Sequence, residues 1–184
     1  MDILEAKNVK ATFFMTGGWV EKYPEDVKKI AEAGHDLANH SEHHYDADKI
    51  TKEQMKEELM LPHQKVKELT GIDMILFRPP SGAYNNDLVN TCKENGYYCI
   101  QWDVDSLDWK NYGVDSIVTT VLEHKHLGNG SIILMHNGGK YTAQALEAVI
   151  TGLETKGFEI VKIADLIYHD HYKIDSEGRQ IKVE

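Results

Sequence analysis

The chain has 184 residues, the length of a single domain, and it is long enough to bury a core without disulfides or structural metals. Its formal net charge of −10 argues against binding to a nucleic-acid backbone or to an anionic membrane surface. Hydrophobic residues make up 41% and charged residues 27%, which is usual for a globular domain and excludes a disordered chain. The sequence shows no signal peptide and no apolar run of the roughly 18 residues that a membrane span needs.

Strand-like and helix-like segments alternate along the chain. Strands are predicted at residues 8–15, 35–39, 74–78, 97–104, 131–135 and 158–161. Helices are predicted at residues 24–34, 51–69, 86–95, 115–125, 142–156 and 163–169, and Pro62 is expected to kink or split the second of them. Short apolar strands separated by helices indicate a mainly parallel sheet covered by helices, as a barrel or as an open doubly wound sheet. The domain is predicted to span residues 1–168, and residues 169–184 form a polar tail with a turn at 176–178.

Polar side chains follow four of the predicted strands. They lie at residues 39–44, 78–82, 103–109 and 136–137. In α/β barrels the chemistry collects at the C-terminal ends of the strands, and parallel strands bring these ends to one rim. The sequence therefore predicts a single active site built from these four segments.

The first of these segments contains His40 and His44, four residues apart. On a helical turn this spacing makes two imidazoles face the same way, so that they can bind one metal ion. Two histidines suit zinc, with cobalt or another first-row ion as the alternative, and a third ligand, usually a carboxylate, is expected. Solvated histidines remain the alternative for this spacing alone.

The other three segments predict acid–base and binding groups. His136 ends an apolar strand, and Asp108 is its expected partner, because a carboxylate on one ring nitrogen fixes the tautomer and raises the imidazole pKa. Arg78 is held rigidly by the prolines after it and is expected to pair with a carboxylate. The loop that begins at Ser81 is placed to direct a backbone N–H at an oxyanion, and Trp109 to form an apolar wall. Core packing of Trp109, a surface position for Arg78 and a structural histidine bonded to the backbone at His136 are the alternatives.

Four motifs in order carry a family resemblance. H-[ST]-x-x-H matches residues 40–44, R-x-P-x-G matches residues 78–82, D-W matches Asp108 and Trp109, and L-x-H matches residues 134–136. With these motifs the chain resembles the polysaccharide deacetylases, the carbohydrate esterase family 4 enzymes with a NodB homology domain, over residues 1–167. It looks most similar to the sporulation-associated branch, which acts on peptidoglycan.

The resemblance implies a deformed (β/α) barrel and a divalent metal, most often zinc. The implied reaction removes N-acetyl groups from N-acetylglucosamine units of peptidoglycan or a chitin-like polysaccharide, with O-deacetylation of acetylxylan as an alternative. The implied location is the cell envelope or the extracellular space. The implied roles are metal binding by His40 and His44, proton donation by His136, tuning of that histidine by Asp108, orientation of the base by Arg78, and substrate binding by Pro80, Ser81, Trp109 and Leu134.

One family motif has no counterpart in the sequence. The family carries T-F-D-D on its first strand, where the first aspartate is the general base and the second is the third metal ligand. The resemblance therefore predicts a barrel that lacks its first strand, with an open sheet edge that favours a homo-oligomer. Three explanations stay open: a fragment of an active enzyme, a degenerate domain that binds glycan or metal without turnover, or rescue by Asp103, Asp105 or an aspartate of another subunit.

Overall fold

The computed structural model describes residues 1–183, and its strands are mainly parallel. Four strands form one parallel sheet in the order β1-β2-β3-β4, and β5 pairs in parallel with β6. The strands are β1 (Thr12–Met15), β2 (Asp36–Asn39), β3 (Leu76–Phe77), β4 (Tyr98–Cys99), β5 (Val104–Asp105), β6 (Ile133–Leu134), β7 (Tyr172–Ile174) and β8 (Gln180–Lys182). The α/β prediction is confirmed; within residues 1–183 the parallel strands form two sheets and do not close into a complete barrel.

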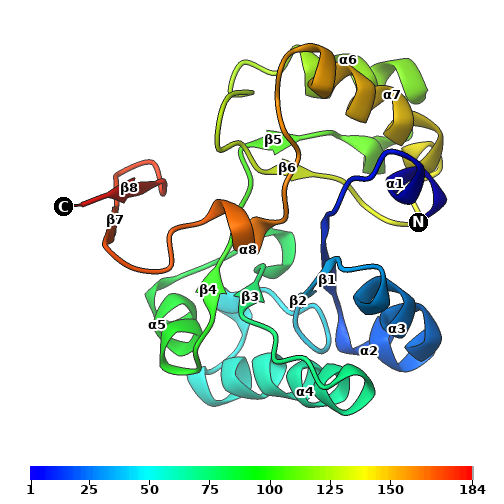
Figure 1. Cartoon of the computed structure of the whole chain (residues 1–184). Helices are drawn as coiled ribbons and strands as arrows, with labels where there is room; N and C mark the ends of the chain where they lie inside the picture. Colours follow the sequence, from blue (N-terminus) through cyan, green and yellow to red (C-terminus); the bar gives the residue numbers. More distant parts are fainter. Residues whose placement is uncertain (184) are drawn as a thin grey trace.

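Helices cover the outer side of these sheets. Figure 1 shows α2 to α5 packed around the β1–β4 sheet, while α6 and α7 lie over β5 and β6. The helices are α1 (Asp2–Ala6), α2 (Gly17–Lys22), α3 (Pro24–Glu32), α4 (Lys52–Thr70), α5 (Asn86–Glu94), α6 (Val114–Leu122), α7 (Thr142–Thr155) and α8 (Ile163–Leu166), with short 3-10 turns η1 (Ala47–Lys49), η2 (Pro80–Gly82) and η3 (Asp108–Lys110).

Helix α4 forms where the sequence signals predict it. Thr51 and Gln54 form a complete capping box, in which each side chain bonds the other residue's backbone N–H. Gly71 ends the helix in the left-handed conformation, with φ of 74°. The expected split at Pro62 is wrong, because the helix is continuous from Lys52 to Thr70 and Pro62 packs buried inside it.

Two of the hydrophobic clusters correspond to the two parallel sheets. One gathers the buried side chains of β1 to β3 and of α2 to α5, with Leu59, Val66 and Phe77 near its centre. The other lies between α6, α7 and β5. Helices α6 and α7 approach closely because position 152 is glycine: a Cβ there would lie 2.3 Å from Cδ1 of Leu122.

The long strand predicted at residues 97–104 is wrong in one respect: it is two strands. Ile100 still donates to the carbonyl of Phe77 on β3, at 2.7 Å, but Asp103 already donates to Ile132 beside β6, at 3.2 Å. The segment therefore changes its pairing partner halfway and joins the two sheets. The strand predicted at residues 158–161 is wrong: the described chain has no strand there, and Phe158 and Ile160 pack against the α6–α7 cluster.

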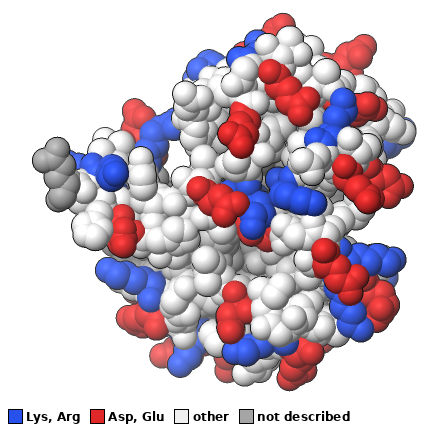
Figure 2. Space-filling model, viewed as in Figure 1, with Lys and Arg blue, Asp and Glu red and all other residues white. Residues whose placement is uncertain are grey.

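The last described residues, predicted as a polar tail with a turn, form a hairpin. Strands β7 and β8 pair antiparallel around the turn predicted at residues 176–178, and Arg179 bonds Asp103 of the main body at 3.3 Å. Figure 1 shows this hairpin projecting to one side. On the face drawn in Figure 2, acidic and basic side chains are interspersed without a broad basic area. None of the helices in residues 1–183 has the length and apolarity that a membrane crossing requires.

Candidate active site

The segment after β2, residues 40–44, is called the histidine loop here. The prediction of a helical turn is wrong, because Ser41 and His44 are left-handed, with φ of 68° and 61°, and no helix forms. The loop nevertheless brings the two imidazoles together: the ring centroids of His40 and His44 lie 4.8 Å apart and the rings are nearly perpendicular, at 83°. The pairing expected from the sequence is present, although a different backbone conformation produces it.

The environment of His40 favours the neutral imidazole. Its Nδ1 lies 2.8 Å from the carbonyl oxygen of Arg78, which can only accept, so Nδ1 carries the proton and Nε2 keeps its lone pair. Burial is the main cause that lowers the pKa of His40 to about 4. The charges of His44, Arg78 and His136 act in the same direction, and the hydrogen bond to the Arg78 carbonyl opposes them. At neutral pH the ring is therefore in the form that binds metals, with its tautomer fixed by the second nitrogen.

These two imidazoles fit a first-row divalent ion by the chemistry of their donor atoms. The expected third ligand is absent from the described residues: nowhere in residues 1–183 do three or more His, Cys, Asp or Glu side chains converge to hold a metal. Asp103 and Asp105 do not fill this position. Asp103 bonds Ser131, the Ile132 amide and Arg179, and Asp105 accepts from the Leu107 amide at 2.9 Å.

His136 and Asp108 form the predicted pair. Asp108 is completely buried at the start of η3, and its Oδ1 lies 2.7 Å from the ring Nδ1 of His136. Its Oδ2 accepts from the backbone N–H of the same histidine at 2.6 Å and from the hydroxyl of Thr142 at 2.7 Å. The carboxylate thus holds both the ring and the backbone of His136, and Nε2 is left free for proton transfer.

In this pair the pKa of Asp108 is lowered and the pKa of His136 is raised from their ordinary values. Burial alone would raise the pKa of Asp108, but the hydrogen bonds from His136 and Thr142 outweigh it and lower the pKa to about 2. The hydrogen bond that the His136 ring donates to Asp108 raises the pKa of His136 against the opposing effect of burial. Thr142 was not predicted from the sequence. A Cβ at Gly139 would lie 2.2 Å from its Oγ1, so the glycine leaves room for this hydroxyl.

Arg78 lies on the same rim but has no acidic partner among residues 1–183. The residue is 6% exposed, its guanidinium carbon lies 4.0 Å above the ring of Phe14, and its Nη2 donates weakly to the carbonyl of Gln101 at 3.4 Å. Its Nε is buried without a hydrogen-bond partner. Burial lowers the pKa of this guanidinium to about 10, which still leaves it charged. The alternative of a surface arginine is excluded, and the predicted carboxylate partner is not found in the described residues.

The predicted substrate-binding residues lie around this rim. Ser81 is left-handed, with φ of 54°, in the turn η2, and Pro80 is buried beside it. An open pocket of about 530 Å³ lies next to them and is lined by Ser81, His44 and Asp46, among others. Leu134 is 9% exposed and Trp109 is 53% exposed, so only Trp109 presents a large apolar surface to solvent.

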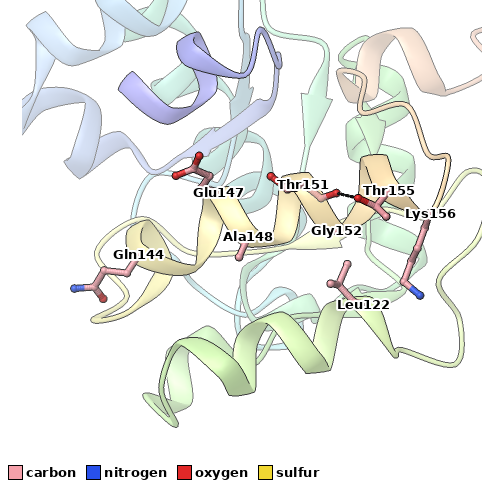
Figure 3. A pocket seen from close by; sticks show the side chains of 8 residues that line it. All are labelled: Leu122, Gln144, Glu147, Ala148, Thr151, Gly152, Thr155 and Lys156. Atoms are coloured by element: carbon pink, nitrogen blue, oxygen red, sulfur yellow. Dashed lines mark hydrogen bonds between the residues drawn. The ribbon is translucent and has the colours of Figure 1, made fainter.

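A second, larger hollow lies away from this chemistry. It has a volume of about 760 Å³ and runs along α6 and α7, as Figure 3 shows. Thr151 and Thr155 face it, and the only hydrogen bond drawn there joins the Thr155 hydroxyl to the Thr151 carbonyl at 2.8 Å. It contains neither a histidine nor a carboxylate pair, so the rim around His40 and His136 is the candidate active site.

Comparison with known proteins defines the class. The model of the family described as polysaccharide deacetylase matches residues 1–100. A peptidoglycan-N-acetylglucosamine deacetylase of Bacillus cereus is 34% identical over 176 residues, which cover 93% of this chain and 81% of that protein. The chain belongs to the polysaccharide deacetylase family, as its motifs predict.

Two further proteins are similar to this chain. The uncharacterised protein YlxY of Bacillus subtilis is 35% identical over 91% of this chain, and the match covers 51% of that protein. The crystal structure of a family pseudoenzyme from Bacillus anthracis superposes with a TM-score of 0.84 at 30% identity, covering 90% of this chain and 58% of that one. The chain therefore spans little more than half the length of these two relatives.

Proposed function

We propose that this chain hydrolyses the acetamide of N-acetylglucosamine units in peptidoglycan or a chitin-like polysaccharide, at the cell envelope or outside the cell. The observation that supports the proposal most is the Asp108–His136 pair, placed on the same rim as the His40–His44 pair. A family model and a deacetylase relative of similar length support the same reaction.

In this reaction water adds to the amide carbonyl, the C–N bond breaks, and the sugar nitrogen leaves with a proton. His136 gives that proton from Nε2, because Nδ1 is committed to Asp108. Its raised pKa keeps a larger fraction of the ring protonated near neutral pH. Asp108 stays ionised and stabilises the imidazolium before transfer.

His40 and His44 would hold the metal, which, when bound, polarises the carbonyl and activates water. The backbone N–H of Ser81 is proposed to bind the oxyanion, and Trp109, Leu134 and Pro80 to line the site of the acetyl methyl. The charge of Arg78 is proposed to pair with the carboxylate that serves as base. Residues 1–183 do not supply this carboxylate at Arg78, since no acidic side chain there pairs with it.

Acetate release is the test. The protein would be incubated with zinc or cobalt and with N-acetylchitooligosaccharide, peptidoglycan or acetylxylan, alongside His136→Ala and the control His126→Ala at an exposed histidine. Release from the N-acetyl substrates that His136→Ala abolishes and His126→Ala preserves supports the proposal. Release from acetylxylan alone would identify an O-deacetylase instead. A folded, metal-treated protein that releases no acetate from any of the three would contradict the proposal.

A second candidate is a domain that binds glycan or metal without turnover. Within residues 1–183 it is favoured by an Arg78 without an acidic partner and by a two-histidine set without a third ligand. The similarity to a pseudoenzyme, of which a mutant is described as having restored enzymatic activity, also favours it. Calorimetric binding of chitooligosaccharide or zinc, together with no acetate release, would support this candidate. Turnover that depends on His136 would exclude it.

A further inference from the structure

The backbone of the histidine loop is held by side chains. The Ser41 amide donates to Oδ1 of Asn39 at 2.9 Å, the His43 amide to Oε2 of Glu58 at 2.7 Å, and the His44 amide to Oγ of Ser41 at 2.9 Å. Ser41 and His44 are left-handed, which costs free energy for residues other than glycine. Such a conformation persists only where the surroundings impose it, and these three side-chain acceptors are the imposing contacts.

Glu58, on α4, contacts the loop in the way that Asp108 contacts His136. One oxygen accepts from the backbone N–H of His43, and the other lies 2.6 Å from Nδ1 of the same ring. Glu58 itself is 7% exposed, whereas the side chain of His43 is 56% exposed. Because the buried Glu58 carboxylate bonds both the backbone N–H and the ring of His43, it fixes the backbone between His40 and His44.

Lys65, two turns further along α4, holds the neighbouring residue. Its ammonium group bonds the carboxylate of Glu42 and lies 2.6 Å from that of Glu21 on α2. The Glu42 carboxylate is nearly buried against Gly17, where a Cβ would lie 1.8 Å from Oε2. Only glycine at position 17 leaves room for this carboxylate, so α2 and α4 enclose the loop from both sides.

A third contact joins Asn39, the last residue of β2 before the loop, to α4. Nδ2 of Asn39 donates to the backbone carbonyl of Leu59 at 2.7 Å and to the hydroxyl of Tyr97 at 3.3 Å. His63 of α4 bonds that hydroxyl at 2.6 Å. Asn39 is completely buried, so its amide is fully used: the oxygen holds Ser41, and the nitrogen holds α4 and Tyr97.

We propose that Glu58 and Lys65 are positioning residues, which hold the histidine loop in the conformation that places His40 and His44 side by side. This inference rests on the proposed role of the two histidines as metal ligands. Outer contacts that orient ligand histidines contribute roughly 10–100-fold to metal affinity. Neither Glu58 nor Lys65 touches the two imidazoles, so their effect is transmitted through the backbone of residues 41–43.

The experiment compares Glu58→Ala, Glu58→Gln and Lys65→Met with Glu57→Ala and Lys56→Met, which change exposed residues on the same helix. Amide hydrogen exchange would be measured in the metal-free proteins, zinc and cobalt affinity by calorimetry, and the free energy of unfolding by urea. In Glu58→Ala we expect faster exchange at Ser41, His43 and His44 and a roughly 10–100-fold weaker metal affinity. Glu58→Gln should restore most of both, because its amide oxygen still accepts from the His43 amide.

The readouts separate this inference from the proposed function. If the wild type released no acetate but bound metal, and Glu58→Ala bound it more weakly, the deacetylase proposal would be contradicted and the positioning role supported. If the wild type bound no metal, the exchange rates of the metal-free proteins would still decide. A folded Glu58→Ala whose Ser41 and His44 amides exchange as in Glu57→Ala would overturn the inference. So would a loss of unfolding free energy with unchanged exchange at Ser41 and His44 and unchanged metal affinity.

Discussion

The carboxylate of Asp108 decides which nitrogen of His136 carries the proton, and the change Asp108→Asn tests this. In the wild type, Oδ1 faces the ring Nδ1, while Oδ2 accepts from the His136 amide at 2.6 Å and from the Thr142 hydroxyl at 2.7 Å. In the variant one oxygen becomes an NH₂ group, which can only donate. The backbone N–H cannot become an acceptor, so the amide oxygen stays on that side and the NH₂ group faces the ring.

The imidazole can adapt to this group only by changing its tautomer. When Nδ1 faces a donor it must accept, and the proton of the neutral ring moves to Nε2. Protonating such a ring would place two donors against each other, so the pKa that Asp108 raises in the wild type falls. The same substitution in a serine protease triad imposes the wrong tautomer and lowers kcat about 10⁴-fold, and we expect a loss of that order here.

Nitrogen-resolved NMR of the histidine rings, followed through a pH titration, measures tautomer and pKa without requiring turnover. The wild type is expected to carry its neutral-ring proton on Nδ1 of His136, and Asp108→Asn on Nε2 with a lower pKa. Asp87→Asn, at an exposed aspartate of α5, is the control and should leave both unchanged. A folded Asp108→Asn in which His136 keeps its tautomer and pKa would refute the reasoning, whatever the rate of acetate release.

Three further predictions concern stability, each measured by urea unfolding. Folding lowers the pKa of Asp108 from 3.8 to about 2, so its contribution of about 2 kcal/mol is present above pH 3.8 and is lost as the pH falls through 2. The raised pKa of His136 acts in the opposite sense: its contribution is present below pH 6.5 and is lost as the pH rises through the folded-state pKa. The Asp108 prediction would be contradicted if the wild type lost no more unfolding free energy than Asp108→Asn between pH 5 and pH 2. The His136 prediction would be contradicted if the wild type lost no more unfolding free energy than His136→Ala above pH 6.5. Thr51→Ala removes the capping box of α4 and should cost about 1 kcal/mol, so an unchanged unfolding midpoint would argue against that cap. Arg78→Met removes a buried cation without an acidic partner in residues 1–183, so stability should stay the same or rise; a loss above about 2 kcal/mol would show that the arginine is compensated.

Local signals predicted the helices of this fold well, and long-range pairing limited the prediction of the strands. Thr51 and Gly71 mark the ends of α4 through contacts within a few residues, which the sequence displays directly. The division of the strand predicted at residues 97–104 has no such signal. It depends on Ile132, some thirty residues away, which takes over the pairing that Phe77 provides before it. The short helix α2 was missed because it begins with two glycines, which are poor helix formers.

For the candidate site, too, the sequence predicted some residues and missed others. His136 and Asp108 were predicted to pair because both follow strands of one parallel set, and the structure places them 2.7 Å apart. Thr142 and Glu58 were missed, since each sits inside a helix where a polar residue is the usual surface choice. Thr142 belongs to the site because its hydroxyl donates to Asp108, which lies on a different element. Glu58 belongs to it because its carboxylate accepts from the His43 amide, which only the folded backbone of the histidine loop brings within reach.

Between residues 100 and 103 the chain changes the strand with which it pairs. This change also explains why the His40–His44 pair and the Asp108–His136 pair share a rim. Up to Ile100 the segment pairs with β3, which ends at Phe77 directly before Arg78, and from Asp103 onward it pairs with the segment leading to His136. The carbonyl of Arg78 holds His40, and η3, a few residues after β5, carries the Asp108 that holds His136. One continuous segment thus connects the strand that leads to Arg78 with the strand that leads to His136. The change Ile100→Pro would remove the amide that bonds Phe77, so we expect it to disturb both pairs together. NMR signals of the His40 and His136 rings would be measured in that variant. If only one of the two rings shifted, the two pairs would be positioned separately.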